Sequence, residues 1–233
     1  MSFDLIKGEI ILVNKPYRWT SFDVVNYTRN IFRTELRIRK YKIGHTGTLD
    51  PLATGLLILC TGQQTKKIED FKDLEKEYIG TFTLGATTAS FDMEKPVDQS
   101  YPFDHITGEE ILQAAIKLSG TYDQMPPVFS AVKINGKRAY EYARKDKEVI
   151  MPPKTITLSA FEITRVALPE VDFRIVCSKG TYIRAIARDF GTELNSGAYL
   201  SALCRTRIGN YKLEDAIETD SLRESIFGKP PVT

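Results

Sequence analysis

The distribution of strand-like segments most constrains the fold of this chain. Residues 156–168 and 171–177 lie on either side of Pro169 and have the apolar patterning of two consecutive strands joined by a short connection. Further strands are predicted at residues 9–13, 56–60, 78–84 and 128–134. Because helices do not regularly separate these strands, the βαβ rhythm of a parallel sheet is missing. The sequence therefore predicts an α+β fold with a mixed, largely antiparallel sheet flanked by helices.

Helices are predicted at residues 21–32, 107–118, 139–145 and 182–194. Ser21 is expected to cap the first of them. The second has a capping box, in which Thr107 and Glu110 satisfy the first free N–H groups of the helix, and it stops before Gly120. These helices are too few and too unevenly spaced to cover both faces of a parallel sheet.

The composition is that of an ordinary globular protein. The 233 residues are 42% hydrophobic, which excludes disordered and fibrous classes and is enough for a core that needs no disulfide or structural metal. Cys60, Cys177 and Cys204 are far apart and are predicted to be reduced and buried. A secretory signal and a long apolar run are both missing, so we expect a cytoplasmic protein that does not enter a membrane.

The charge is unevenly distributed along the chain. Residues 1–68 carry eleven basic and five acidic side chains, whereas residues 69–110 carry three basic and eleven acidic ones. Basic side chains cluster at residues 29–42 and 133–147. If the two clusters share a face, they form a phosphate-binding surface, as in nucleic-acid-binding proteins. The alternative is that both are ordinary solvated faces.

Several common functional sites can be excluded from the sequence. The chain has only two histidines, His45 and His105, without further ligands at metal-binding spacing. The glycine-rich motifs that bind nucleotide phosphates, GxGxxG and GxxxxGK[ST], do not occur. We therefore expect neither a zinc site nor one of these two nucleotide-binding sites.

Residues 44–55, GHTGTLDPLATG, contain three glycines and one proline and predict an ordered loop. Asp50 lies between the bulky Leu49 and Pro51, which should draw its carboxylate toward the interior. A carboxylate in such a place needs a charged or hydrogen-bonding partner. The alternative is that Asp50 only caps a turn of the backbone.

This segment closely resembles the signature of the TruB family, the bacterial tRNA pseudouridine-55 synthases. The resemblance extends from about residue 8 to about residue 211. Its other matching blocks are Lys15-Pro16 with Thr20-Ser21, Tyr78, Pro126 with Ser130-Ala131, residues 140–144, residues 178–184, and Leu203 with Arg205. The resemblance implies the pseudouridine synthase catalytic fold as a single domain over residues 1–233, with an RNA-gripping insertion near residues 128–152.

The resemblance also implies an activity. Family members isomerise uridine 55 in the T loop of tRNA to pseudouridine, so the expected partner is the T-arm stem-loop of tRNA. The base leaves ribose through N1 and returns through C5, so no atom is gained or lost and no cofactor or metal is required. We expect a monomer without an obligate protein partner.

Three matching residues correspond to the family's catalytic groups. Asp50 matches the nucleophile, which attacks either C1′ of the sugar or C6 of the uracil. Arg184 matches the arginine that keeps this carboxylate charged, because a neighbouring guanidinium stabilises the ionised form. The alternative for Arg184 is an exposed helix charge. Tyr78 matches the residue that stacks on the target base and takes part in proton transfer, although core packing would explain an isolated tyrosine on a strand.

The remaining matches concern substrate binding. His45 corresponds to the histidine that enters the T loop beside the flipped base, and its place between Gly44 and Thr46 predicts an exposed ring. The alternative is a histidine that only hydrogen-bonds its own loop. Tyr182 and Leu203 correspond to residues that line the uracil pocket. The basic stretch implied to grip RNA includes Lys137, Arg138 and Arg144.

Two departures from the family pattern stand out. Arg18 occupies a position where family members commonly have glycine, so the turn there must either avoid positive φ or carry strain. Few residues follow Tyr211, so we expect no C-terminal PUA domain, an RNA-binding module that family members often carry. Two other functions remain open: a tRNA-folding chaperone with little or no catalysis, and a carboxylate glycosidase, which would need a second carboxylate near Asp50.

Overall fold

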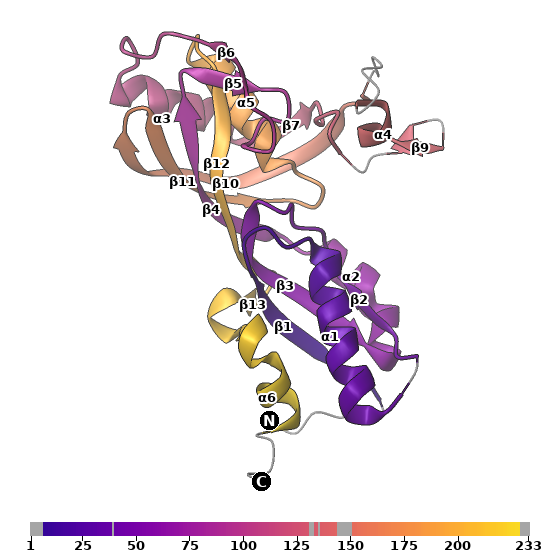
Figure 1. Ribbon diagram of the computed structural model, residues 1–233. Coiled ribbons are helices and arrows are strands. Elements are labelled where there is room, and N and C mark those ends of the chain that lie inside the picture. Colours follow the sequence, from indigo (N-terminus) through magenta and orange to yellow (C-terminus); the bar gives the residue numbers. More distant parts are fainter. Residues whose placement is uncertain (1–6, 39, 131–132, 135, 144–150, 229–233) are drawn as a thin grey trace. The chain divides into compact units, whose positions relative to one another are not determined.

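The computed structural model describes residues 7–38, 40–130, 133–134, 136–143 and 151–228 (Figure 1). It divides into two compact units, of which unit 1 is Met1–Tyr78 with Cys204–Thr233 and unit 2 is Ile79–Leu203. Strands β4 (Lys76–Leu84) and β12 (Ala198–Ile208) pass from one unit into the other. The two units are described separately below.

Unit 1 is built on a sheet in which the strands follow the order β14-β1-β3-β12-β4. Besides parts of β4 and β12, its strands are β1 (Ile10–Lys15), β2 (Ile43–His45), β3 (Ala53–Thr61), β13 (Tyr211–Lys212) and β14 (Ile217–Glu218). β1 pairs parallel with β14 and antiparallel with β3, so the sheet is mixed as predicted. β2 pairs with the other part of β3, and β13 pairs with β12.

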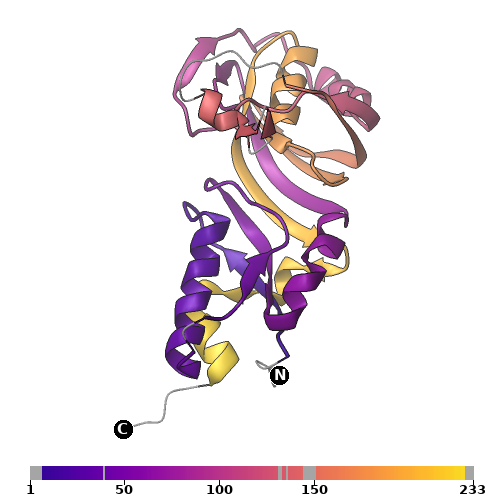
Figure 2. The same ribbon diagram turned by 90° about the vertical axis from the view of Figure 1, so that its right-hand side faces the viewer.

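Helices cover both faces of this sheet (Figures 1 and 2). The helices of unit 1 are α1 (Ser21–Leu36), α2 (Ile68–Lys72) and α6 (Leu222–Phe227), with the 3₁₀ turns η1 (Gly62–Lys67), η2 (Leu213–Asp215) and η3 (Thr219–Ser221). α1 and α6 pack on the face that carries Val13 and Leu57, whereas α2 packs on the face that carries Leu56 and Ile58. Because β3 is buried on both faces, its sequence reads as a continuous apolar run.

Unit 2 continues with the strand order β12-β4-β11-β10-β7. Its further elements are β5 (Ala86–Thr88), β6 (Val97–Ser100), α3 (Gly108–Lys117), β7 (Gly120–Gln124), β8 (Lys133–Ile134), β9 (Lys137–Arg138), α4 (Ala139–Ala143), β10 (Lys154–Ala167), β11 (Glu170–Cys177) and α5 (Ile183–Glu193). β10 pairs antiparallel with both β11 and β7. Four phenylalanines join α5 to this sheet, with ring centroids 4.1 Å apart for Phe82 and Phe173 and 5.4 Å apart for Phe82 and Phe190.

The first helix differs from its prediction in where it begins and ends. Its N-cap is Thr20, not Ser21, and Thr20 and Asp23 form a reciprocal capping box. The helix continues to Leu36, four residues beyond the predicted end. The capping box of Thr107 and Glu110 at α3 is confirmed.

The predicted strand at residues 128–134 is mostly wrong. Residues 128–130 form bends, in which the N–H of Ser130 donates to the carbonyl of Val128 at 2.8 Å, and only Lys133–Ile134 pairs as a strand. Residues 131–132 lie outside the described residues. The sequence reading also missed β7 and the whole of β12, because their short or weakly alternating apolar patterns resemble loop sequence. Cys60 and Cys177 are free and buried as expected, whereas Cys204 is free and half-buried.

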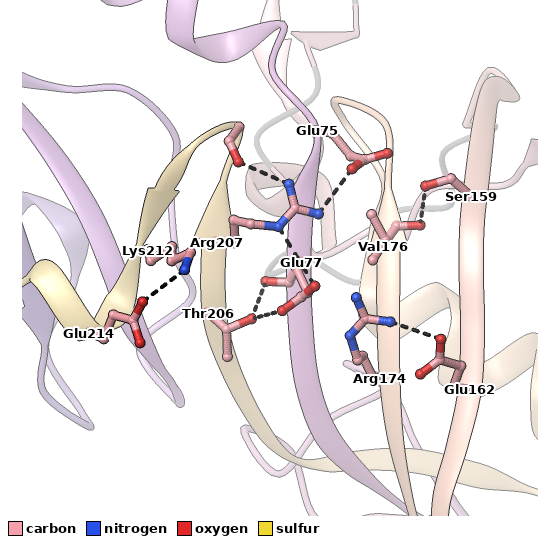
Figure 3. A network of polar contacts seen from close by, with 11 residues as sticks. Glu75, Glu77, Ser159, Glu162, Arg174, Val176, Thr206, Arg207, Lys212 and Glu214 are labelled. Atoms are coloured by element: carbon pink, nitrogen blue, oxygen red, sulfur yellow. Dashed lines mark hydrogen bonds and ion pairs between the residues drawn. The ribbon is translucent and has the colours of Figure 1, made fainter.

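In both units, ion pairs connect side chains on or next to neighbouring strands of the sheet (Figure 3). In unit 1, the guanidinium of Arg207 on β12 lies 3.0 Å from the carboxylate of Glu75 and 3.7 Å from that of Glu77. In unit 2, Arg174 on β11 lies 2.9 Å from Glu162 on β10. Exposed pairs of this kind contribute little to stability, at most about 1 kcal/mol each, but they favour the observed register. In the described part of the chain, every helix is too short or too polar to cross a lipid bilayer.

Candidate functional site

Asp50 lies in a loop of unit 1 between β2 and β3. The segment predicted as a loop is shorter than expected, because Gly44-His45 belong to β2 and Ala53 begins β3. The N–H of Thr46 donates to the carbonyl of Ile58 at 3.1 Å as the chain enters the loop. The N–H of Ala53 donates to the main-chain carbonyl of Asp50 at 3.0 Å as the chain leaves it. Main-chain hydrogen bonds therefore close both ends of this turn.

The residue before Asp50 is held by a single hydroxyl. Ser21 Oγ accepts a hydrogen bond from the N–H of Leu49 at 2.8 Å and donates to the carbonyl of Leu49 at 3.2 Å. Leu49 is only 3% exposed, and Asp50 beside it is half-buried, as the sequence predicted. Ser21 thus fixes the loop rather than the end of α1, which explains why it is not the helix cap.

Arg205 on β12 holds the first half of the loop from inside unit 1. Its Nε donates to the carbonyl of Leu56 at 2.8 Å, and one terminal nitrogen donates to the carbonyl of Gly47 at 3.2 Å. The side chain is fully buried. Gly55, with φ of 104°, packs so closely on Arg205 that a Cβ atom there would lie 2.4 Å from the Arg205 carbonyl oxygen. Glycine at this position therefore permits the close approach of β3 to β12.

Lys15 holds the second half of the loop. Its buried ammonium donates to the carbonyls of Trp19 at 2.6 Å and Pro16 at 3.1 Å, and it lies 3.5 Å from the carbonyl of Pro51. Burial lowers the pKa of Lys15 from 10.5 to about 8, while the Asp50 carboxylate opposes this shift. The negative charge of Asp50 therefore acts on Lys15 within the same unit, although the sequence reading assigned no cation of unit 1 to this loop.

The stability of the protein should depend on the titration of Lys15. The unfolded chain keeps this proton up to about pH 10.5, whereas the folded protein releases it near pH 8. The free energy of unfolding should therefore rise as the pH increases from 8 to 10.5, because the cost of burying the charge disappears. Urea unfolding at several pH values should show this rise in the wild type and a smaller rise in K15M.

An exposed lysine provides the control for that experiment. K66M should change the free energy of unfolding by less than about 0.5 kcal/mol, with the same pH profile as the wild type. Identical pH profiles for K15M and the wild type would show that Lys15 does not titrate in this range.

His45 ends β2 and is more buried than its glycine-flanked position suggested. Its side chain is half-buried, and its Nδ1 atom is buried without a hydrogen-bond partner among the described residues. Burial is the main cause that lowers the pKa of His45, and the Arg205 guanidinium lowers it further. The imidazole is therefore predominantly neutral at pH 7.

Tyr78 is the last residue of the N-terminal part of unit 1. It lies on β4 and is buried. This burial is compatible both with stacking on a target base and with packing in the core. Its predicted catalytic role is not decided by this burial.

Arg184 belongs to unit 2, where three groups hold it. Its terminal nitrogens donate to the carbonyls of Ser90 and Phe129, both at 3.1 Å, and its Nε lies 3.6 Å from the Asp92 carboxylate. The side chain is buried, so the alternative of an exposed helix charge is wrong. Because Asp50 and Arg184 lie in different units, their expected pairing stays a prediction.

Asp92 is the ion-pair partner of Arg184, and the sequence reading missed it. One carboxylate oxygen accepts from Ser90 Oγ at 2.6 Å and from the N–H of Glu94 at 2.9 Å, and the other faces Arg184. Asp92 is 5% exposed, and buried carboxylates need such partners. The sequence signal for Asp92 was its position between the apolar residues Phe91 and Met93. Asp50 also lies between apolar residues, so this signal did not distinguish the two.

Tyr182 is the N-cap residue of α5, and an amide holds its main chain. The buried side chain of Gln124 accepts from the N–H of Tyr182 at 2.9 Å and donates to its carbonyl at 3.1 Å. Leu203 lies half-buried on β12 at the end of unit 2. Gln124 was not foreseen either, because 58 residues separate it from Tyr182.

The residues that the resemblance predicts to grip RNA are only partly described. The main chain of Lys137 and Arg138 forms β9, which pairs with β8 in a hairpin. Arg144 lies outside the described residues. Of the helix predicted at residues 139–145, the described part is α4, which ends at Ala143.

Comparisons with known proteins agree with the resemblance seen in the sequence. Residues 29–183 match the model of the TruB family pseudouridylate synthase (N terminal domain). The "tRNA pseudouridine synthase B" of Phocaeicola vulgatus is 52% identical over 94% of this chain and 93% of its own length. The protein of the same name from Flavobacterium johnsoniae is 47% identical over 96% of this chain and 98% of its own length.

A solved structure supports the predicted fold. The chain matched in "Crystal Structure of a Cbf5-Nop10-Gar1 Complex" is 27% identical, with a TM-score of 0.72 over 94% of this chain. This chain spans about half the length, 54%, of that solved chain. The prediction of a pseudouridine synthase catalytic fold is thus confirmed, and the chain belongs to the TruB family of pseudouridylate synthases, which are isomerases.

Proposed function

We propose that this protein isomerises uridine 55 in the T loop of tRNA to pseudouridine, with Asp50 as the nucleophile. The family match and the names of relatives that are about half identical to this chain support the reaction and the tRNA substrate. The assignment of Asp50 is supported by the way its loop is held. Ser21, Arg205 and Lys15 each bind a main-chain carbonyl of the loop, before or after Asp50 in the sequence.

The reaction requires a charged carboxylate in a fixed position. The glycosidic bond from C1′ to N1 breaks, the uracil turns, and a new bond forms from C1′ to C5, after which the C5 proton is lost and N1 gains a proton. An Asp50 oxygen begins this exchange by attacking either C1′, where N1 of the uracil leaves, or C6, where the oxygen adds to the C5–C6 double bond. The bond to Asp50 breaks again when C5 bonds to C1′ in the first case, or when the C5–C6 double bond forms again in the second, so the carboxylate is released. A loop held at several main-chain atoms limits the movement of the carboxylate and so favours reactive geometry.

The other roles follow the resemblance. Arg184 keeps the nucleophile charged, and its buried guanidinium is already oriented by Asp92 and two carbonyls within unit 2. Tyr78 stacks on the target base and takes part in proton transfer. Tyr182 and Leu203 line the uracil pocket, and His45 enters the T loop as a neutral ring beside the flipped base.

Product analysis tests this proposal directly. The purified protein is incubated with an unmodified T-arm stem-loop, without added metal or nucleotide, and the RNA is digested and examined by mass spectrometry after labelling of pseudouridine. Pseudouridine at the position equivalent to 55 supports the proposal. Tight binding and faster tRNA folding without this product would instead favour the chaperone function.

The basic stretch of the insertion should bind the RNA backbone. Neutralising Lys137, Arg138, Arg144 and Lys145 together should weaken tRNA binding and flatten its dependence on salt, because each lost phosphate contact lowers the log–log slope by about 0.7 to 0.9. Binding is measured by filter retention at several salt concentrations.

The control for this variant uses two basic side chains of unit 2 that form ion pairs with acidic residues of the same unit. Lys117 and Arg165 form ion pairs with Glu193 and Asp172, so K117Q/R165Q should leave the salt slope nearly unchanged. A wild-type slope in the fourfold variant would remove residues 137–145 from the RNA-binding surface.

A further inference from the structure

The turn before α1 has an unusual backbone at Arg18. The N–H of Trp19 donates to the carbonyl of Pro16 at 3.4 Å, so Arg18 is the third residue of a four-residue turn. Its φ is 68°, in the left-handed region that turns of this kind usually reserve for glycine. From the sequence, the turn at Arg18 was expected either to avoid positive φ or to carry strain. The structure shows positive φ, and therefore strain.

The surroundings of Arg18 compensate for this strain by tying the turn to the loop of Asp50. The N–H of Arg18 donates to the carbonyl of Pro51 at 2.8 Å, and the Lys15 ammonium bridges the carbonyls of Trp19 and Pro51. Arg18 therefore lies directly beside the residue that follows Asp50, and both belong to unit 1.

The side chain of Arg18 is exposed, in contrast to the other cations described beside this loop. Lys15 and Arg205 are fully buried and donate to main-chain carbonyls. The Arg18 guanidinium lies over the Tyr17 ring, 5.6 Å from its centroid, and Tyr17 is itself 44% exposed. Among the described residues, no carboxylate lies within ion-pair distance of Arg18, so its charge is available to a ligand.

We propose that Arg18 binds a backbone phosphate of the RNA next to the target uridine, with its guanidinium oriented by the Tyr17 ring. This inference rests on the proposed function, because it needs an RNA at the Asp50 loop. A planar guanidinium matches the oxygens of a phosphate, and stacking on an aromatic ring reduces the freedom lost on binding. Glycine in this turn would be conformationally easier but could not supply the contact.

The test separates the charge of Arg18 from its backbone. R18Q removes the charge and R18K keeps it, while both keep a side chain at the same left-handed position. With a minimal T-arm stem-loop, R18Q should raise KM and the dissociation constant about 3- to 10-fold, leave kcat within about twofold, and lower the salt slope by about 0.7 to 0.9. R18K keeps the charge but lacks the planar guanidinium that lies over Tyr17, so it should restore the wild-type salt slope and only part of the affinity.

The matched control is R223Q, which removes the same charge from α6 in unit 1. Arg223 lies 2.8 Å from Glu35, near the far end of the 16-residue helix α1, about 24 Å from the turn at Arg18. R223Q should bind the stem-loop like the wild type. Thermal unfolding of all variants shows whether each is folded before binding is compared.

Two results would overturn the inference. Wild-type binding and salt slope in R18Q would show that Arg18 does not touch the RNA. An equally lowered salt slope in R18Q and R18K would show that the charge at position 18 does not contact a phosphate. Binding is measured independently of turnover, so both results can be interpreted even if the wild type forms no pseudouridine. The lack of pseudouridine would contradict the proposed function and not this inference.

Discussion

Replacing Asp50 by asparagine is expected to lower pseudouridine formation by at least about 10⁴-fold while leaving RNA binding nearly intact. An amide has the size of the carboxylate but carries no charge and is a very poor nucleophile. The loop itself should survive, because Ser21 and Arg205 hold the main-chain carbonyls of Leu49 and Gly47.

Single-turnover reactions with excess enzyme and the T-arm stem-loop measure this effect, because they report the chemical step without product release. Filter binding gives the affinity of D50N in parallel. The control is D220N, which changes an exposed aspartate of unit 1 in the same way and should leave turnover unchanged. D50N with turnover within tenfold of the wild type would refute the assignment of the nucleophile.

Replacing Asp92 by asparagine is expected to destabilise the protein by about 3 kcal/mol and to reduce kcat about 10- to 100-fold. Asp92 and Arg184 form an ion pair in which both side chains are 7% exposed. Removing a carboxylate that neutralises a buried guanidinium is costly, because water cannot replace it. The asparagine also holds the guanidinium less firmly, so a group proposed to act on the nucleophile becomes less well oriented.

Urea unfolding and single-turnover kinetics measure the two effects. The control is E170Q, which breaks an exposed ion pair with Arg165 in the same unit and should cost less than about 1 kcal/mol. If D92N unfolds like the wild type and turns over at the same rate, the ion pair contributes to neither stability nor catalysis. Lower stability with normal kcat would restrict Asp92 to a structural role.

Local sequence patterns predicted the longer helices and several of the strands. The capping box at Thr107, the strand pair around Pro169 and the buried face of β11 follow from short-range hydrogen bonds and side-chain alternation. The same reasoning failed at the start of α1, where two neighbouring residues could each cap the helix. Thr20 and Ser21 can both cap a helix, and only the contact of Ser21 with Leu49 shows why Thr20 is the cap.

The candidate site shows a similar division. The motif at residues 44–55 identified Asp50, and its apolar neighbours correctly predicted a half-buried position. The roles of Lys15 and Arg205 around the loop, and of Asp92 and Gln124 in unit 2, were not predicted. Each of them acts through hydrogen bonds or ion pairs whose partners are distant in the sequence, as for Arg205 and Gly47, which are 158 positions apart.

The sequence by itself determined the α+β class, the family, the loop that carries Asp50 and the unusual residue at position 18, because these depend on composition, periodicity and contiguous motifs. Only the tertiary structure decided which groups hold the loop, that Arg184 faces Asp92, and that Arg18 adopts a left-handed backbone beside Pro51. The reason is physical: strand order and packing determine which distant residues meet, and a buried charge takes its partner from whatever the fold places within reach.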